Sequence, residues 1–385
     1  MKFEVFWKNP GYKIRPELKE DIDCDYLIIG GGITGASAAY FLAKAGAKNV
    51  VLIEKHYIAS GATGKAAGTL VIRGETDLLD IVKLHGEEKA EVYWKEIHGG
   101  LNSLRQIIRE ENIDCDAETQ DSLYCTLIHK YPYIKKEYEA EKRIEPTTKL
   151  LNGPDLKREL NTDMFSYGIL SANHGLSVNP LKLTQNLSVA TEKYGARIFE
   201  NTALLRILGN IAQTHHGNIR FKKVITAIDL DNPNDKVKNL RTTILITQPL
   251  TSEELIKTGM DRRKIVFDSK KSYNYFKVTA DRRMLFGFGN MIVHKGHRKT
   301  EPHVPHLKNM EKFMAKLFPY LALTPEYVWS GNFGVTRDYC PLIEINGDAS
   351  SISGAGSQVI CFMAAKHIVN KILGEKSSLE EFFTG

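Results

Sequence analysis

The stretch DYLIIGGGITGASAAYFL, residues 25–42, constrains the fold more than any other part of the chain. An apolar, strand-like segment runs into a glycine-rich turn, and a helix-like segment follows as far as Gly46. Read as Gly30-x-Gly32-x-x-Gly35, the turn has the spacing of a dinucleotide-binding loop. The apolar segment NVVLIEK at 49–55 predicts a second buried strand, which completes a β-α-β unit.

Each glycine of this loop has a physical role in nucleotide binding. Gly30 permits the tight turn, Gly32 lets the backbone approach a pyrophosphate, and Gly35 lets the helix pack closely on the strand. The helix N-terminus offers free N–H groups and the positive end of its dipole to the phosphates. Glu54 ends the second strand, 19 residues after Gly35, where a carboxylate accepts a hydrogen bond from a ribose hydroxyl. The alternative is a glycine-rich turn without a ligand.

The loop alone does not distinguish NAD from FAD, but later segments favour FAD. After Glu54 the chain enters GATGKAAG, at 61–68, whose small residues let the backbone lie against a bulky ring system. Near the other end, GAG at 354–356 precedes a helix. A reduced flavin carries negative charge near its N1 atom and C2 carbonyl, and a helix N-terminus aimed at that charge stabilises it. The order of these segments predicts FAD.

Composition sets broader limits. The chain has 385 residues, 42% hydrophobic and 25% charged, which suffices for a large core and two domains. The net charge of +6 is thinly spread and lacks the dense basic run of a nucleic-acid-binding protein. The five cysteines contain no Cys-x-x-Cys, which predicts a reducing compartment and no metal site. The chain shows no apolar signal core and no membrane-spanning run, so we expect a cytoplasmic protein without an integral membrane segment.

The remaining patterns indicate two interleaved regions. Residues 1–22 form a polar arm whose aromatic side chains we expect to dock on the body. The charged run at 135–145 predicts an exposed helix, and a helix at 177–195 has Pro180 in its first turn. A strand-rich region around 235–320 contains a hairpin with its turn near Asp281.

Taken together and in order, these segments resemble the D-amino-acid oxidase/glycine oxidase superfamily of FAD-dependent oxidoreductases over nearly the whole chain. The γ-glutamylputrescine oxidoreductase type is the most similar branch, on IDCD at 113–116, YFKVTADRRMLFG at 275–287 and WSGNF at 329–333. The resemblance implies an α/β (α+β) fold, in which a Rossmann-like FAD-binding domain of the glutathione-reductase/p-hydroxybenzoate-hydroxylase type is interleaved with an antiparallel-sheet substrate domain. The implied boundaries are an N-terminal arm at 1–22, an FAD-binding domain at 23–85, 155–232 and 325–385, and a substrate domain at 86–154 and 233–324.

The resemblance also implies a set of cofactor-binding residues by position. They are Gly30, Gly32, Ile33, Thr34, Gly35, Glu54, Lys55, Thr63, Gly64, Lys65, Ala66, Leu204, Ala227, Gly354, Ala355, Gly356, Ser357 and Gln358. The implied chemistry is hydride transfer from a C–H beside an amine nitrogen to flavin N5, followed by hydrolysis of the imine. The implied electron acceptor is O2 or another acceptor.

Several positions depart from the family pattern. Relatives that oxidise free amino acids carry an arginine for the substrate carboxylate where this chain has Phe333. The cysteine or histidine that anchors a covalent flavin falls at Gly331 or Lys65, so we expect a non-covalent FAD. The usual Ala-Thr-Gly reads Ala-Ile-Asp at 227–229, and Gln358 replaces a glycine. Leu285 stands where some oxidases carry an oxygen-activating lysine.

Tyr275 and Lys65 are the candidate catalytic residues. Tyr273 and Tyr275 alternate with Asn274 along a strand, so both face one side, where Tyr275 bounds an amine pocket if that side faces the flavin. Sheet packing is the alternative for both tyrosines. Lys65 contacts flavin or phosphate, or else points to solvent. His174, a loop histidine, is a candidate base for which a structural role is more common.

The sequence therefore predicts an FAD-dependent oxidoreductase that oxidises the C–N bond of a small amine or amino-acid-like substrate. Two alternatives stay open. One is another branch of the superfamily, either a sarcosine- or glycine-type oxidase or a tRNA-modification oxidase. The other is a flavin-binding partner subunit without turnover, which the Ala-Ile-Asp and Gln358 departures motivate.

Overall fold

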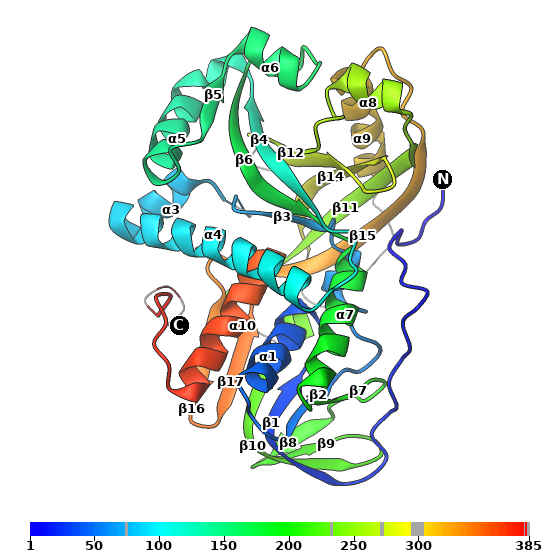
Figure 1. Ribbon diagram of the computed structural model, residues 1–385, viewed down its shortest axis with the longest axis vertical. Coiled ribbons are helices and arrows are strands. Elements are labelled where there is room, and N and C mark those ends of the chain that lie inside the picture. Colours follow the sequence, from blue (N-terminus) through cyan, green and yellow to red (C-terminus); the bar gives the residue numbers. More distant parts are fainter. Residues whose placement is uncertain (74–75, 232–233, 270–272, 294–303, 381, 383–385) are drawn as a thin grey trace.

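The computed structural model describes residues 1–73, 76–231, 234–269, 273–293, 304–380 and 382. Two β-sheets lie one above the other along the long axis of the molecule, and helices pack between and around them (Figure 1). This mixed arrangement confirms the predicted α/β (α+β) fold class.

The first sheet has the order β16-β17-β10-β1-β2-β7 and is parallel from β17 to β7. The predicted β-α-β unit is confirmed as β1, α1 and β2. An antiparallel pair, β8 and β9, extends this sheet from β10. Its strands are β1 (Ile22–Ile29), β2 (Val50–Ile53), β7 (Arg197–Phe199), β8 (Arg206–Leu208), β9 (Ile211–Gln213), β10 (Asn218–Thr226), β16 (Leu342–Asn346) and β17 (Ala349–Ser353).

The second sheet has the order β15-β11-β14-β13-β12-β4-β6-β3 and is antiparallel except for β12 against β4. The predicted hairpin is confirmed as β13 and β14, and its turn holds Arg282 at φ +66°. The strands are β3 (Thr69–Val71), β4 (Glu118–Thr126), β5 (Lys149–Leu151), β6 (Tyr167–Ser177), β11 (Val237–Pro249), β12 (Lys264–Asp268), β13 (Asn274–Val278), β14 (Arg283–Ile292) and β15 (Pro325–Thr336).

Helices pack around both sheets, and α1, α7 and α10 lie side by side on one face of the first (Figure 1). The predicted helix with Pro180 in its first turn is confirmed as α7. The helices are α1 (Ile33–Lys44), α2 (Ala62–Lys65), α3 (Leu78–His85), α4 (Glu87–Glu110), α5 (Tyr131–Ile144), α6 (Gly153–Glu159), α7 (Pro180–Lys193), α8 (Ser252–Thr258), α9 (Val304–Leu317) and α10 (Gln358–Leu373), with short 3₁₀ turns at Ile128–Lys130 and Asp229–Asp231. None of the described helices is long and apolar enough to cross a membrane.

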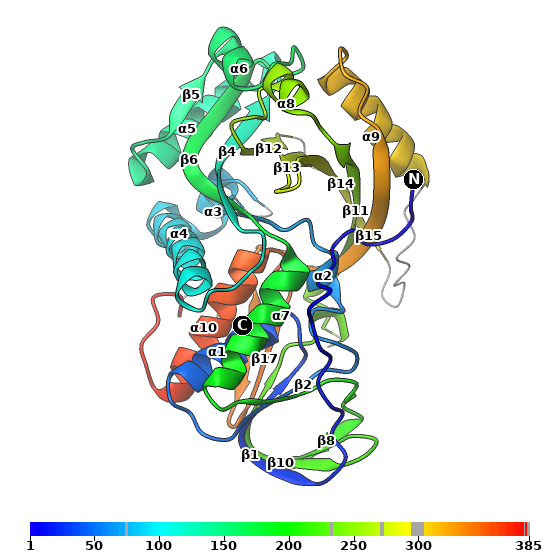
Figure 2. The same cartoon turned by 45° about the vertical axis from the view of Figure 1, so that its right-hand side comes forward.

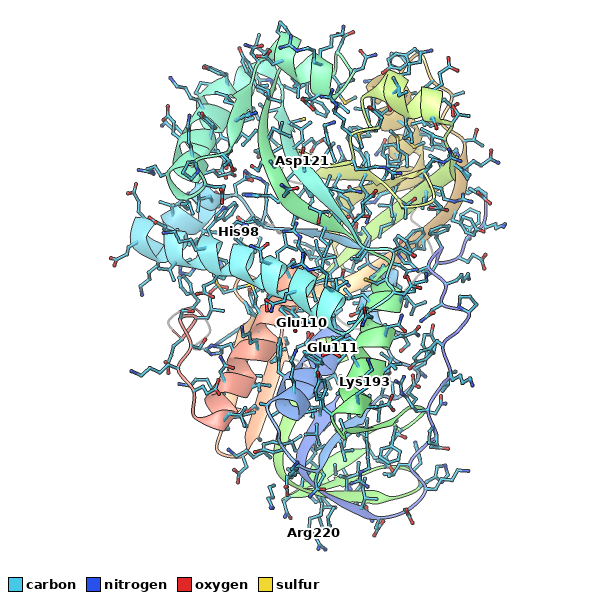
Figure 3. All side chains as sticks on the ribbon, in the orientation of Figure 1. His98, Glu110, Glu111, Asp121, Lys193 and Arg220 are labelled. Carbon is cyan, nitrogen blue, oxygen red and sulfur yellow. The ribbon has the colours of Figure 1, made fainter. Side chains whose placement is uncertain are left out.

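Helix α4 crosses the molecule between the two sheets (Figures 1 and 2). Its buried residues, among them Tyr93, Ile97, Leu101 and Leu104, recur at helical spacing and form its apolar face. Just past its last turn, the Glu111 carboxylate accepts hydrogen bonds from the hydroxyls of Tyr40 on α1 and Tyr194 after α7, at 2.8 and 2.6 Å. Figure 3 labels Glu111 beside Lys193 at this junction. Glu111, at the charged end of α4, therefore links α1 to the end of α7.

The expectation of an exposed helix at 135–145 is half right. The segment is helical, as part of α5, but Glu137 is fully buried and Glu141 nearly so. Both carboxylates form ion pairs with the buried guanidinium of Arg73. A buried cation far away in the sequence therefore explains why two charged residues of this run point inward.

The division into domains stays a prediction. The two sheets divide the chain along similar lines, because the segments at 23–68, 178–226 and 342–373 build the first sheet with its helices. Three strands assigned to the FAD-binding domain, β3, β6 and β15, pair within the second sheet. The predicted domain boundaries in the sequence therefore do not coincide with the boundary between the two sheets.

The N-terminal arm packs along both sheets and their helices, as its aromatic residues predict (Figure 2). Trp7 is 6% exposed, and its indole N–H donates to the carbonyl of Ala66 at 2.7 Å. The Tyr12 hydroxyl donates to the Glu200 carboxylate at 2.6 Å, and Leu18 is buried against the first sheet. The arm therefore contributes to the hydrophobic core beside each of the two sheets.

Lys277 of β13 is a fully buried amine inside the second sheet. Its Nζ donates to the carbonyl of Gly68 at 2.5 Å and to the Ser177 hydroxyl at 2.8 Å, and it lies 5.8 Å from the centre of the Trp7 ring. Burial lowers the pKa of Lys277 to about 7, and the more distant Glu118 opposes this shift. The amine joins β13 to the start of β3 and the end of β6, and its lowered pKa reduces the charge that is buried there.

The stability of the holoprotein is expected to rise with pH between about 7 and 10, because the unfolded Lys277, with its ordinary pKa of 10.5, binds a proton that the folded amine does not. One such group contributes up to about 1.4 kcal/mol per pH unit in this window. We expect Lys277→Met to show a smaller slope of unfolding free energy against pH in urea denaturation. The exposed Lys366→Met is the control. Equal slopes in the wild type and Lys277→Met would contradict the assignment.

Candidate active site

A cavity of about 590 Å³ lies where the two sheets meet. Its wall combines the β1–α1 turn, the end of β2, the α2 segment and the end of β10 with β12, β13 and β15 of the second sheet and the β17–α10 turn. The volume falls within the range of small-molecule and cofactor sites. The carboxyl ends of parallel strands β1, β2 and β10 open into it, which is where ligands bind in open α/β sheets.

Most of the predicted site residues meet at this cavity. The predicted site residues that line the cavity are Gly30, Gly32, Ile33, Thr34, Glu54, Lys55, Thr63, Lys65, Ala66, Leu204, Ala227, Tyr275, Gly354, Ala355, Gly356, Ser357 and Gln358. Gly35 and Gly64 lie behind the wall. A Cβ on Gly35 would lie 1.9 Å from the carbonyl oxygen of Gly30, and one on Gly64 would lie 2.2 Å from that of Ala59. These two glycines act through backbone packing.

The glycine loop is held in shape by its neighbours. Gly30 has φ +109°, and a Cβ there would lie 2.4 Å from the carbonyl oxygen of Ala227, so only glycine fits. The Thr63 hydroxyl accepts a hydrogen bond from the backbone N–H of Ile33 at 3.0 Å. This contact fixes the α2 segment against the first turn of α1, whose N-terminus faces the cavity.

Glu54 is both a structural acceptor and part of the cavity wall. One carboxylate oxygen accepts the N–H of Gly31 at 2.7 Å, and the other accepts that of His56 at 3.0 Å. An ionised carboxylate has about four acceptor positions. The side chain therefore fixes the loop and keeps capacity for a ribose hydroxyl, which is its predicted role.

The α2 segment is held from its other side by two tryptophans. Trp329 of β15 donates its indole N–H to the carbonyl of Lys65 at 2.8 Å, beside the bond from Trp7 to Ala66. The two rings pack edge to face with centroids 6.3 Å apart. The Lys65 side chain runs along Gly331, and burial, followed by repulsion from Lys55, lowers its pKa.

The β17–α10 turn forms the far wall. Gly354 and Gly356 have φ near +65° (+68° and +63°), and the Ser357 hydroxyl caps α10 by accepting the N–H of Val359 at 3.3 Å. Buried polar atoms here and nearby have no hydrogen-bond partner among the described residues. They are the hydroxyls of Thr69, Thr242 and Ser353 and both polar atoms of the Gln358 amide. Buried polar atoms are normally satisfied, so this wall is suited to a polar ligand.

Asp229 links two parts of the cavity wall, a role that the amino-acid sequence did not indicate. It adopts φ +46°, and its two carboxylate oxygens accept the backbone N–H groups of Gly334 at 2.8 Å and Gly354 at 3.0 Å. One side chain thus ties β15 to the β17–α10 turn across the cavity wall. The sequence signal was the aspartate in place of glycine, at a position where Asp and Asn tolerate a left-handed backbone.

An aromatic wall closes the cavity on the side of the second sheet. Phe267, Tyr273 and Tyr275 all line it, with ring centroids 6.0–6.2 Å apart, and Phe333 lines it from β15. The Tyr275 ring lies over Gly287, where a Cβ would come within 1.8 Å of the ring. Tyr273 and Tyr275 therefore lie on the same side of β13 and both face the cavity, and the catalytic role of Tyr275 stays a prediction.

His174 lies elsewhere. It is on β6, 7% exposed, beside His98 and Glu145 at a separate small cavity, and is not among the residues that line the large one. The candidate base of the sequence therefore does not reach this site in the described structure.

The fold and the cavity define a class: an α/β protein with a dinucleotide site that opens onto an antiparallel sheet. The chain belongs to the DAO family of FAD dependent oxidoreductases, whose profile matches residues 25–365. FAD is therefore its cofactor, and the protein is an FAD-dependent oxidoreductase. The predicted family membership is confirmed.

Similar proteins agree with this membership. The chain is 28% identical over 379 residues to γ-glutamylputrescine oxidoreductase of Escherichia coli, covering 95% of this chain and 87% of that protein. Among solved structures, L-proline dehydrogenase from P. horikoshii has a TM-score of 0.80 at 18% identity, covering 95% and 97% of the two chains. Glycine oxidase from Geobacillus kaustophilus has a TM-score of 0.79 at 16% identity, covering 94% and 98%. The two structures show the shared fold.

Asp229→Ala is expected to weaken FAD binding at least tenfold, because without the Asp229 carboxylate nothing ties the N–H groups of Gly334 and Gly354 together and the β17–α10 turn loses its fixed place in the cavity wall. The measurement is the Kd of FAD for apoprotein by flavin fluorescence. Asp229→Asn keeps one acceptor and should lie between the two, and the exposed Asp348→Ala is the control. FAD binding by Asp229→Ala equal to that of the wild type would refute the role.

Proposed function

We propose that this protein oxidises the C–N bond of a small amine at the aromatic end of the cavity. The observation that carries the proposal is the continuity of one cavity from the glycine loop to Tyr273, Tyr275 and Phe333. A ligand that extends from the first sheet toward the second would bring its reactive ring to that aromatic wall. The predicted cofactor-binding residues support this placement.

When bound, FAD supplies the two-electron acceptor for a hydride from the carbon beside the amine nitrogen, and water then converts the imine to a carbonyl compound and an amine. We propose that the glycine loop and the N-terminus of α1 hold the pyrophosphate, and that Glu54 binds the ribose. The β17–α10 turn, with the N-terminus of α10 and the Gln358 amide, would face the pyrimidine end of the ring. Gly331 and Lys65 at the anchor positions of related covalent enzymes support non-covalent binding.

The charges of the cavity wall favour a neutral amine. Among the described residues that line it, the cationic side chains are Lys55 and Lys65, and the acidic ones are Glu54 and Asp229. These two positive and two negative side chains balance, so they give the wall no net negative charge that would attract an ammonium group. A neutral amine has the lone pair that forms the C=N bond as hydride leaves. We propose that Lys65 disfavours the protonated substrate by its charge, and that Tyr275 bounds the amine.

Phe333 supports an amine without a free α-carboxylate beside the reacting carbon. A bidentate arginine clamp for a carboxylate is missing among the described residues of the wall. The similarity to γ-glutamylputrescine oxidoreductase supports a polyamine or its γ-glutamyl conjugate as the substrate class. The electron acceptor is O2 or another acceptor, and the leucine at position 285, where some oxidases of the family carry an oxygen-activating lysine, supports the latter. We also propose a cytoplasmic location, which the five free cysteines support.

The test is anaerobic reduction of the bound flavin, followed as bleaching of its absorbance, over polyamines, their γ-glutamyl conjugates, N-methyl amino acids and proline analogues. We expect a polyamine or conjugate to bleach the flavin fastest. Fastest bleaching by an N-methyl amino acid would instead assign a sarcosine-type branch. A flavin that dithionite bleaches and no amine does would favour a partner subunit without turnover. Binding of tRNA in a gel shift would favour the tRNA-modification alternative.

Gly287→Ala is expected to raise KM for the amine and slow flavin reduction at least tenfold without changing FAD binding, because the new methyl group displaces the Tyr275 ring. Stopped-flow reduction and FAD titration separate the two effects. The control is Gly99→Ala on α4, where a Cβ would meet nothing within 4 Å. Unchanged reduction kinetics in Gly287→Ala would show that Tyr275 does not bound the amine.

A further inference from the structure

Two histidines and a glutamate converge at a second, smaller cavity. His98 comes from α4, Glu145 follows the last turn of α5, and His174 lies on β6. Their side chains are 32%, 22% and 9% exposed, and with Trp94 and Ile72 they line a cavity of about 70 Å³. Figure 3 labels His98 on the side of α4 turned toward the second sheet. Three distant segments thus bring three potential ligands to one place.

The distances between these groups fit a shared ion better than direct hydrogen bonds. Glu145 Oε2 lies 3.4 Å from His98 Nδ1 and 3.6 Å from His174 Nε2. Charge-assisted hydrogen bonds are shorter, at about 2.7–2.9 Å. Ligands about 2.0–2.1 Å from a tetrahedral zinc ion stand about 3.4 Å apart. One ligand atom from each residue lies within 4.8 Å of the other two, so the three groups are close enough to share one ion.

A hydrogen bond from a neighbouring residue orients the Glu145 carboxylate. The other oxygen of Glu145 accepts a hydrogen bond from the Thr147 hydroxyl at 3.1 Å, which leaves Oε2 toward the imidazoles and orients it.

Nearby cations are engaged with other partners. The Lys95 ammonium, on the rim of the small cavity, lies 2.6 Å from the Glu91 carboxylate. The Arg105 guanidinium donates to the carbonyls of Asn173 and Gly175, at 2.5 and 2.8 Å. The cavity has room for an ion and a water, since a single water needs about 10–15 Å³.

We propose that His98, Glu145 and His174 form a binding site for a divalent transition-metal ion of the zinc class. Two imidazoles and one carboxylate suit zinc and its neighbours, with water as the fourth ligand in the small cavity. The ion would join α4, α5 and β6, outside the wall of the FAD cavity. The proposal revises the expectation of no metal site, which rested on cysteine spacing and took no account of histidines brought together from separate elements.

The test is calorimetric titration of EDTA-treated holoenzyme with ZnCl2. We expect one ion per chain, at least tenfold weaker affinity in His98→Ala and in Glu145→Gln, and a zinc-dependent rise in the thermal unfolding midpoint that both variants lack. His98 is half-exposed on a helix, and unchanged flavin absorbance and far-UV circular dichroism would confirm that the variants fold.

Two controls keep the assignment specific. His216 and Glu17 form an exposed pair with the same 3.4 Å separation and only one histidine, so His216→Ala should leave zinc affinity unchanged. His85, Asp338 and Cys340 form another cluster of potential ligands, in which burial raises the pKa of the Cys340 thiol to about 12. Loss of zinc binding in His85→Ala with retention in His98→Ala would overturn the proposal. Absence of stoichiometric binding in the wild type would overturn it equally.

Discussion

The close approach of backbone to backbone at the end of β1 is the constraint on which the cofactor site depends. The carbonyl of Gly30 occupies the space where Gly35 would carry a side chain, and the carbonyl of Ala227 occupies that of Gly30. Strands β1 and β10 and helix α1 can therefore meet at one corner, with the helix N-terminus facing the cavity. Any side chain at these positions would separate the three elements and remove the surface that a pyrophosphate needs.

Polar contacts transmit this arrangement to the second sheet. Thr63 links the α2 segment to α1, and the indoles of Trp7 and Trp329 hold the same segment through the carbonyls of Ala66 and Lys65. Asp229 then ties β15 to the β17–α10 turn. These five hydrogen bonds hold the parts of the wall between the two sheets in place around the cavity.

The sequence predicted the parts of the site that depend on local chain geometry. The glycine loop, Glu54, the α2 segment and the β17–α10 turn are short motifs whose residue types follow from nearby backbone, and the alternation of Tyr273 and Tyr275 placed both on one face. It did not predict contacts made across the fold. The inward turn of Glu137 requires Arg73, and the role of Asp229 requires two distant glycine N–H groups. His174 found its partners on α4 and α5, which no spacing in the chain reveals.

The docking of Trp7 has a consequence for the order in which the molecule is assembled. Its partners are Ala66, close behind it in the chain, and Trp329, more than 300 residues later. Chains emerge from the ribosome with the N-terminal part first. Trp7 therefore cannot complete its packing until β15 has been synthesised, and contacts of such long sequence separation form slowly. FAD is accordingly expected to bind to its completed site only late in the synthesis and folding of the chain.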